Sequence, residues 1–250
     1  MEEPRLWNLL RELKSPSYEW VDLTHAFDDE SPRWQGFPAM ESRAVYDYDN
    51  AIFRAHVYSL VGQYGTHVDA PVHFYEQGRT LDQIGVREMV FPLCVVDVHK
   101  KVEKNCDYAL SRKDLEEWES RHGRIPEGAF VAMRSDWHKR WPDSEACMNF
   151  DSAGNVHYPG WSLEALCFLI EEWGVGAVGH EAFDTDPPAL EEQAPLQGEY
   201  YVLSHDRIQV EVMANLDKVP EAGAVIFCAF PKAKGGAGFS ARCFVVFPKE

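Results

Sequence analysis

Hydrophobic residues along the chain fall mostly into short runs of strand length. The runs are rich in Val, Ile, Phe and Tyr and are bounded by Gly, Pro or Asp, which is the pattern of β-strands. The predicted strands cover residues 18–23, 53–61, 90–98, 129–134, 177–180, 224–230 and 243–247. The chain is therefore expected to contain at least one sizeable β-sheet.

Three segments carry a helical pattern instead. Leucines at positions 6, 9, 10 and 13 predict a short amphipathic helix near the N-terminus. A second helix, 114–121, follows Ser111 as its N-cap, with Asp114 three residues on, and stops before Gly123. A third, 163–173, has Ser162 as its N-cap and Gly174 as its stop signal.

Predicted strands outnumber predicted helices and do not alternate strictly with them. This order favours a mixed α/β layer structure over a doubly wound nucleotide fold or an eight-fold barrel. No GxGxxG or GxxxxGK[ST] motif follows a strand, so no phosphate-binding loop is predicted. The glycines at 235, 236 and 238 lie between two late strands and predict a mobile loop rather than a ligand contact.

Composition narrows the class of protein. The 250 residues, 45% hydrophobic, predict one compact domain over positions 1–250. A net charge of −17 argues against a nucleic-acid partner, which needs clustered Lys and Arg. No run reaches the roughly 20 apolar residues of a membrane span, and the acidic start does not resemble a signal peptide, so we expect a cytoplasmic protein. The six cysteines form no CxxC pair, and no disulfide framework is expected; three of them, Cys94, Cys167 and Cys228, lie in apolar runs and are expected in the core.

The densest chemical signal is the run GQYGTHVDAPVHF at residues 62–74. Because Gly and Pro interrupt it, we expect a loop leaving the edge of a sheet. In extended backbone His67 and Asp69 point to the same side, and an imidazole with a carboxylate suits Zn²⁺ or Mn²⁺. Gln63 can add an amide oxygen, and His73 stands four residues after Asp69. A His-x-Asp pair alone is common in turns, so the metal prediction depends on the rest of the chain.

Seven segments in order resemble the cyclase family, which includes kynurenine formamidase and isatin hydrolase. The run at 62–74 is similar to the family signature HxGTHxDxPxH. The other six segments are VDLTH at 21–25, RSDW at 134–137, HYPGWS at 157–162, GHE at 179–181 with the Asp residues at 184 and 186, IQVEVMANL at 208–216, and PK at 231–232 with the glycines after it. The resemblance implies a swivelling β/β/α fold, with mixed β layers and flanking helices.

The resemblance also implies a set of metal ligands. His67, Asp69 and Glu211 stand at ligand positions of the family. Gln63 replaces the first His of the signature, and Glu199 replaces a His twelve residues before Glu211, while His205 lies nearby but out of register. Both replacements exchange nitrogen for oxygen, so Mn²⁺ is favoured and Zn²⁺ is the alternative. One or two metal ions both remain compatible.

Other family positions imply roles around the metal. His73 aligns with the last His of the signature, which implies that it shuttles protons. The alternative is that His73 only holds the Asp69 side chain in place. His180, Glu181 and Asp186 are expected to be structural. The residues expected to form an aromatic wall for a flat substrate are Trp34, Tyr64, Phe74 and Trp137.

The family's chemistry implies a metal-dependent hydrolase that opens an amide, lactam or lactone bond of a small substrate, and a homo-oligomer, dimer or tetramer. The replaced ligands make kynurenine formamidase activity itself less favoured than a related specificity. Two alternatives are a non-catalytic metal- or ligand-binding homologue and a metal-free isomerase or dehydratase using Glu181 and His73. The stretch 107–155 is longer than in the shortest members and is predicted to be an insertion, either a helical flap or an oligomer contact.

Overall fold

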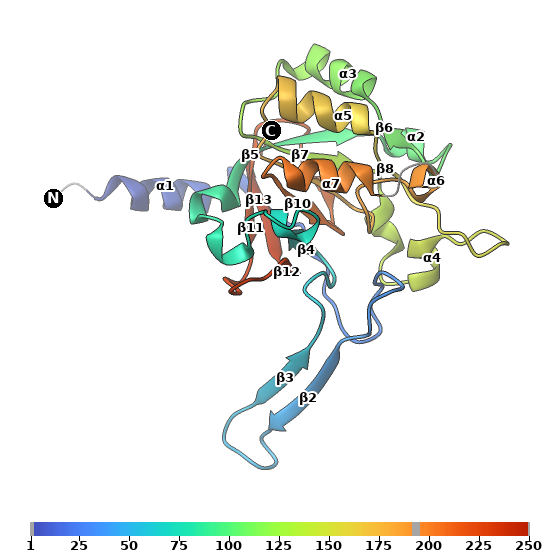
Figure 1. Ribbon diagram of the computed structural model, residues 1–250. Coiled ribbons are helices and arrows are strands. Elements are labelled where there is room, and N and C mark those ends of the chain that lie inside the picture. Colours follow the sequence, from blue (N-terminus) through green and yellow to red (C-terminus); the bar gives the residue numbers. More distant parts are fainter. Residues whose placement is uncertain (1–2, 192–195, 250) are drawn as a thin grey trace.

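The computed structural model describes residues 3–191 and 196–249 (Figure 1). Its helices are α1 (Arg5–Leu13), α2 (His99–Val102), α3 (Arg112–His122), α4 (Ser144–Met148), α5 (Leu163–Cys167), α6 (Pro188–Glu191) and α7 (Gln197–Ser204). Its strands are β1 (Tyr18–Asp22), β2 (Glu41–Tyr46), β3 (Ala55–Ser59), β4 (His67–Asp69), β5 (Val90–Asp97), β6 (Ala109–Leu110), β7 (Phe130–Arg134), β8 (Gly160–Trp161), β9 (Ala177–His180), β10 (Ile208–Glu211), β11 (Ala224–Ala229), β12 (Gly238–Ser240) and β13 (Arg242–Pro248).

A nine-stranded mixed sheet forms the centre of the molecule, in the order β1-β13-β11-β5-β7-β9-β10-β4-β12. The four strands from β5 to β10 run parallel, and the strands on both sides of them pair antiparallel. Side chains alternate across the sheet: on β7, Val131 and Met133 join one hydrophobic cluster, and Phe130 and Ala132 join the other.

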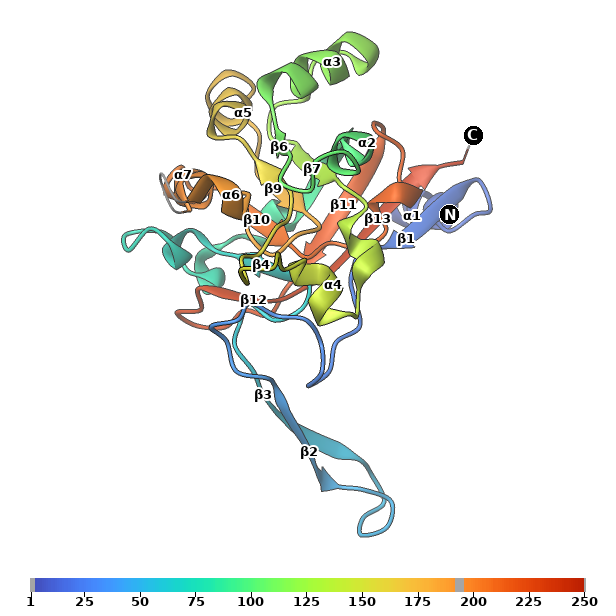
Figure 2. The ribbon, with the colours of Figure 1, turned by 90° about the vertical axis from the view of Figure 1, so that its right-hand side faces the viewer.

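Helices cover one face of this sheet, and the other face curls upon itself. Figure 2 shows α3, α5 and α7 along one side of the strands. On the opposite face, Val68 of β4 and Val245 of β13 belong to one cluster although their strands lie near opposite ends of the sheet order. The predicted mixed α/β class, with a curled sheet and flanking helices, is confirmed.

The predicted helices form where their caps indicated. The Asp114 carboxylate accepts the Ser111 backbone N–H at 2.7 Å and closes the N-terminal end of α3. Ser162 Oγ accepts the Ala165 N–H at 3.2 Å at the start of α5, which continues as a π-helical turn through Glu172. The predicted N-terminal helix is α1, and none of its side chains is buried.

Two predictions about local structure are wrong. The metal-binding run is not wholly a loop, because β4 pairs within the sheet between β10 and β12. Gly238 begins strand β12 opposite Asp69 and does not lie in a mobile loop. Residues 53–61 do contain β3, but β3 pairs only with β2, in a hairpin that projects from the body (Figure 1).

The stretch 107–155 is part of the main structure. It contains β7, which lies in the middle of the sheet, and α3, whose Leu115 and Trp118 are buried against the sheet. The Trp118 indole N–H donates to the Val95 carbonyl of β5 at 3.0 Å. A peripheral flap is therefore not the role of this stretch as a whole.

Candidate metal centre

Two antiparallel strands bring together the three predicted ligands that match the family without change. His67 of β4 pairs directly with Glu211 of β10, and Asp69 lies two residues along β4 on the same side. His67 Nε2 is 3.4 Å from Asp69 Oδ2 and 3.4 Å from Glu211 Oε2. One ligand atom from each residue lies within 4.8 Å of the others, and all three residues are buried. This spacing allows all three side chains to bind a single cation.

The imidazole of His67 is oriented by the backbone beside it. Its Nδ1 is 2.8 Å from the Gly65 carbonyl, so the Nδ1 proton is donated there and Nε2 faces the carboxylates. Gly65 has φ of +63°, a left-handed conformation that a residue with a side chain rarely adopts. The glycine of the signature therefore fixes which nitrogen of His67 is available as a ligand.

Glu199 and His73 approach the same cluster from outside the two strands. Asp186 accepts the backbone N–H groups of Gly198 and Glu199, at 2.8 and 3.1 Å, and so holds the first turn of α7 at the site. Glu199 Oε1 is 3.8 Å from His73 Nε2. The same nitrogen is 3.9 Å from Asp69 Oδ1, and the His73 side chain is 24% exposed. Glu199 thus lies beside the cluster and lines the cavity above it.

The structure also adds a residue that the sequence analysis did not select. Gln209 is fully buried, and its Nε2 lies 3.3 Å from Asp69 Oδ2, 3.0 Å from Glu199 Oε1 and 3.1 Å from Glu211 Oε1. Its Oε1 accepts the Thr185 hydroxyl at 2.9 Å, which fixes the orientation of the amide. The available signal was the alternation of β10, which puts residues 209 and 211 on one face.

Negative charge is concentrated at this centre. Burial, and then the carboxylates of Glu211 and Asp69, raise the pKa of Glu199 well above its usual value. Burial opposes protonation of His67, yet Asp69 and Glu211 together raise its pKa. Burial by itself would raise the pKa of Asp69. The neighbouring His67 has the larger, opposite effect, so the Asp69 pKa is lowered. Three buried carboxylates around few cationic groups fit a divalent cation, which would neutralise them.

The other two candidate ligands differ in their placement. Gln63 lines the cavity and its Nε2 donates to Asp69 Oδ1 at 3.1 Å. To bind a cation, this amide must turn so that its oxygen takes the place of the nitrogen. His205 is exposed at the end of α7, where its Nδ1 lies 2.7 Å from the Tyr201 carbonyl. His205 therefore does not replace the missing His.

A cavity of about 220 Å³ opens above the cluster. Trp34 and Phe74 line it as predicted, and Arg33, Phe37 and Phe183 line it in addition. Four aromatic rings therefore stand in the lining, together with the carboxylates and imidazoles of the cluster. Such a lining suits a small flat molecule with one polar, reactive edge.

Two of the four predicted aromatic contacts are absent from this wall. Tyr64 is fully buried, and its hydroxyl donates to the Asp28 carbonyl at 2.9 Å. Trp137 is 3% exposed, and its indole N–H donates to the Cys147 carbonyl at 3.0 Å. The polar group of each ring therefore has its hydrogen-bond partner inside the protein. The prediction that Tyr64 and Trp137 contact substrate is wrong.

The residues expected to be structural do brace the site. Glu181 Oε2 accepts the backbone N–H groups of Ser135 and Trp137 at 2.9 and 3.0 Å, and Oε1 is 2.7 Å from His138 Nδ1. His180 is fully buried, with Nε2 3.3 Å from Glu211 Oε1. Glu181 and Asp186 hold backbone N–H groups, as predicted, and His180 supports Glu211 from inside the protein.

Comparisons with known proteins agree with this fold. A family model described as putative cyclase matches residues 21–187. Isatin hydrolase of Roseibium aggregatum is 31% identical over 252 residues, which covers 95% of each chain. An isatin hydrolase bound to the product analogue thioisatinate superposes with a TM-score of 0.92 at 29% identity, covering 98% of each chain. Isatin hydrolase A from Ralstonia solanacearum has a TM-score of 0.91 at 30% identity, covering 99% of this chain and 98% of its own.

The curled mixed sheet with its flanking helices is thus shared with hydrolases of known structure. The chain belongs to the cyclase family, and the resemblance read from its motifs is confirmed. The family model ends before Glu199 and Glu211, so these two positions rest on the geometry of β10 and α7.

Proposed function

We propose that this protein is a divalent-metal-dependent hydrolase that opens a C–N bond in a small cyclic or aromatic amide, with a lactone as the alternative substrate. The observation that carries the proposal is the buried cluster of His67, Asp69 and Glu211 at one end of an aromatic cavity. The match to isatin hydrolase over 95% of the chain supports it, because that relative acts on a cyclic amide.

The cation is held by His67, Asp69 and Glu211, with Glu199 and Gln63 within reach. When bound, it supplies Lewis-acid chemistry, polarising a carbonyl and lowering the pKa of a water molecule. One imidazole among carboxylate and amide oxygens forms a hard ligand set, which favours Mn²⁺ over Zn²⁺. Gln209 keeps the three carboxylates apart and correctly oriented.

The reaction also needs a group that moves protons, and His73 is placed for it. It lines the cavity beside the cluster, and its Nε2 is further than hydrogen-bonding distance from Asp69 and Glu199. It is therefore free to accept a proton from the attacking water and to return one to the leaving nitrogen. Trp34 and Phe74 hold the ring of the substrate, and Arg33 provides positive charge for the carboxylate that hydrolysis releases.

The two alternative functions receive less support. A metal-free isomerase using Glu181 is wrong, because Glu181 is 3% exposed, engaged by Ser135 and His138, and absent from the cavity lining. A non-catalytic homologue is expected to lose either the ligand cluster or the neighbouring histidine. Here the cluster is intact, and His73 stands beside it at the mouth of an open cavity.

We also propose that the protein forms a homo-oligomer, a dimer or tetramer, through the β2–β3 hairpin. Large hydrophobic side chains remain exposed on it, including Ile52 at 95% and Tyr58 at 60%. A two-stranded hairpin is marginally stable by itself, and so large an apolar surface is usually covered. A second copy of the chain offers a symmetric way to cover it.

Elemental analysis followed by turnover tests the hydrolase proposal. Protein purified without chelator or added metal should contain a stoichiometric divalent metal, and Asp69→Asn should not. A panel of a cyclic amide such as isatin, an aromatic lactone and N-formylkynurenine should then show hydrolysis, fastest for the cyclic amide. Stoichiometric metal without turnover of any of them would favour the non-catalytic homologue.

A further inference from the structure

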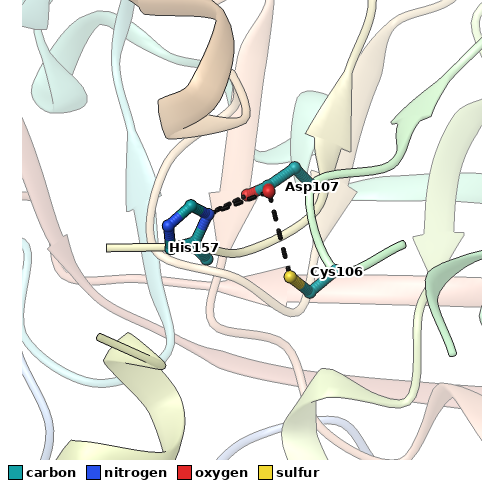
Figure 3. Close-up of side chains that lie close together, drawn as sticks. All are labelled: Cys106, Asp107 and His157. Atoms are coloured by element: carbon teal, nitrogen blue, oxygen red, sulfur yellow. Dashed lines mark hydrogen bonds and ion pairs between the residues drawn. The ribbon is translucent and has the colours of Figure 1, made fainter. Parts of the chain in front are cut away.

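A second cluster of metal-ligating side chains lies away from the catalytic cavity. Cys106 and Asp107 are adjacent in the turn after α2, and His157 comes from the segment before β8. Figure 3 shows the Asp107 carboxylate between the thiol and the imidazole. One ligand atom from each lies within 4.8 Å of the others. The three residues have no part in the chemistry proposed above.

We propose that Cys106, Asp107 and His157 form a binding site for a thiophilic divalent cation of the Zn²⁺ type, separate from the catalytic metal. A thiolate, a carboxylate and an imidazole are the three side-chain ligands that Zn²⁺ combines most often. The set is softer than the oxygen-rich catalytic set, because it contains sulfur. The two sites therefore differ in the metal they select.

The distances agree with this assignment. Cys106 Sγ is 3.8 Å from Asp107 Oδ2, and His157 Nδ1 is 2.8 Å from the same oxygen. Zinc bond lengths put neighbouring tetrahedral ligands about 3.3–3.8 Å apart. The shorter distance is that of a hydrogen bond, so a cation would displace the proton between Nδ1 and the carboxylate and widen this gap by roughly 0.5 Å.

The second ring nitrogen of His157 provides an independent observation. Its Nε2 is 3.5 Å from Asp151 Oδ2, on the side away from Cys106 and Asp107. Asp151 is itself fixed, since it accepts the Asn155 backbone N–H and side-chain amide, each at 2.9 Å. A carboxylate that takes the outer proton of a histidine leaves the inner nitrogen as a ligand, which is the arrangement found around protein-bound zinc.

The site would fasten a segment that contributes to the substrate cavity. The residue after His157 is Tyr158, whose hydroxyl donates to the Asp184 carboxylate, and Asp184 lines the catalytic cavity. Without the cation, the His157 imidazole is held by its pairs with Asp107 and Asp151, and the His157 backbone bonds to Met148 and Asn149. The cation would thus act as a structural clamp between residues 106–107 and 157.

Cobalt titration distinguishes this site from the catalytic one. Co²⁺ added to chelator-treated protein should produce a thiolate-to-metal charge-transfer band, and in His67→Ala this band should saturate at one equivalent. The catalytic cluster contains no sulfur, so the band should persist in His67→Ala. It should be lost in Cys106→Ser and weakened in His157→Asn. Cys167→Ser, which alters another half-buried thiol, is the matched control and should keep the band.

Circular dichroism and a thermal melt verify that each variant is folded. In His67→Ala, whose catalytic cluster is disabled, Zn²⁺ should raise the midpoint of the melt, and adding Cys106→Ser should remove that increase at the same metal concentration. Absence of a band at saturating Co²⁺, or a band that survives Cys106→Ser, would overturn the proposal. Because the readout is optical, it is independent of whether the protein hydrolyses any substrate.

Discussion

Replacement of His73 by alanine separates a proton carrier from a residue that merely holds a ligand. His73 Nε2 is 3.9 Å from Asp69 Oδ1 and 3.8 Å from Glu199 Oε1, so it contributes little to holding either carboxylate. His73→Ala should therefore keep its metal. A general acid–base group contributes roughly 10²–10⁴ in rate, so kcat should fall by that factor, or about 2.7–5.4 kcal/mol of barrier.

Steady-state kinetics with elemental analysis provides the measurement. KM should change little, because proton transfer acts mainly in the transition state. His56→Ala, which changes an exposed histidine on the β2–β3 hairpin, is the control and should leave kcat and metal content unchanged. If His73 only orients Asp69, the variant should instead lose roughly 10–100-fold in metal affinity. Recovery of kcat to near wild type at saturating metal would refute the proton-carrier role.

Four further predictions test the centre and its surroundings. His67→Ala should abolish stoichiometric metal, and full occupancy in elemental analysis would remove His67 from the ligand set. Wild type should be more active with Mn²⁺ than with Zn²⁺, and Gln63→His should shift the ratio toward Zn²⁺; identical ratios would exclude Gln63 as a ligand. Glu181→Gln should lower the free energy of unfolding in urea by about 2–4 kcal/mol, because a buried carboxylate loses charged hydrogen bonds; a change below about 1 kcal/mol would contradict its bracing role. Ile52→Asp should yield a smaller species in light scattering, whereas Val86→Asp, at another strongly exposed apolar position, should not; an unchanged mass for both would count against the hairpin interface.

Local signals predicted much of the fold. The caps at Ser111 and Ser162 are short-range interactions, and both helices start where these residues stand. Strand β4 was missed because the glycine and proline residues beside it are typical of loops. Its extended conformation is instead decided by pairing with β10 and β12. That pairing is a long-range property and leaves little trace in a window of three residues.

The site was likewise predicted where local motifs carry the information and missed where tertiary contacts decide. His67, Asp69 and Glu211 belong to motifs, so the sequence identified them, and the strand register then brought them together. Tyr64 and Trp137 were misplaced because an aromatic residue in a motif can face either a cavity or the core. Only the tertiary hydrogen bonds to Asp28 and Cys147 distinguish the two cases.

The pairing of β4 with β10 has a consequence for folding. Asp69 and Gln209, which face one another across these strands, are 140 positions apart in the chain. A cation that binds both strands binds only the folded pairing, so it stabilises by mass action a contact whose long loop is costly in conformational entropy to close. Hydrogen exchange at the β4 and β12 amides should therefore slow when metal is added, while the amides of β1 and β13 at the opposite end of the sheet change least. Loading with metal would then be the last step by which the active enzyme locks its strand register.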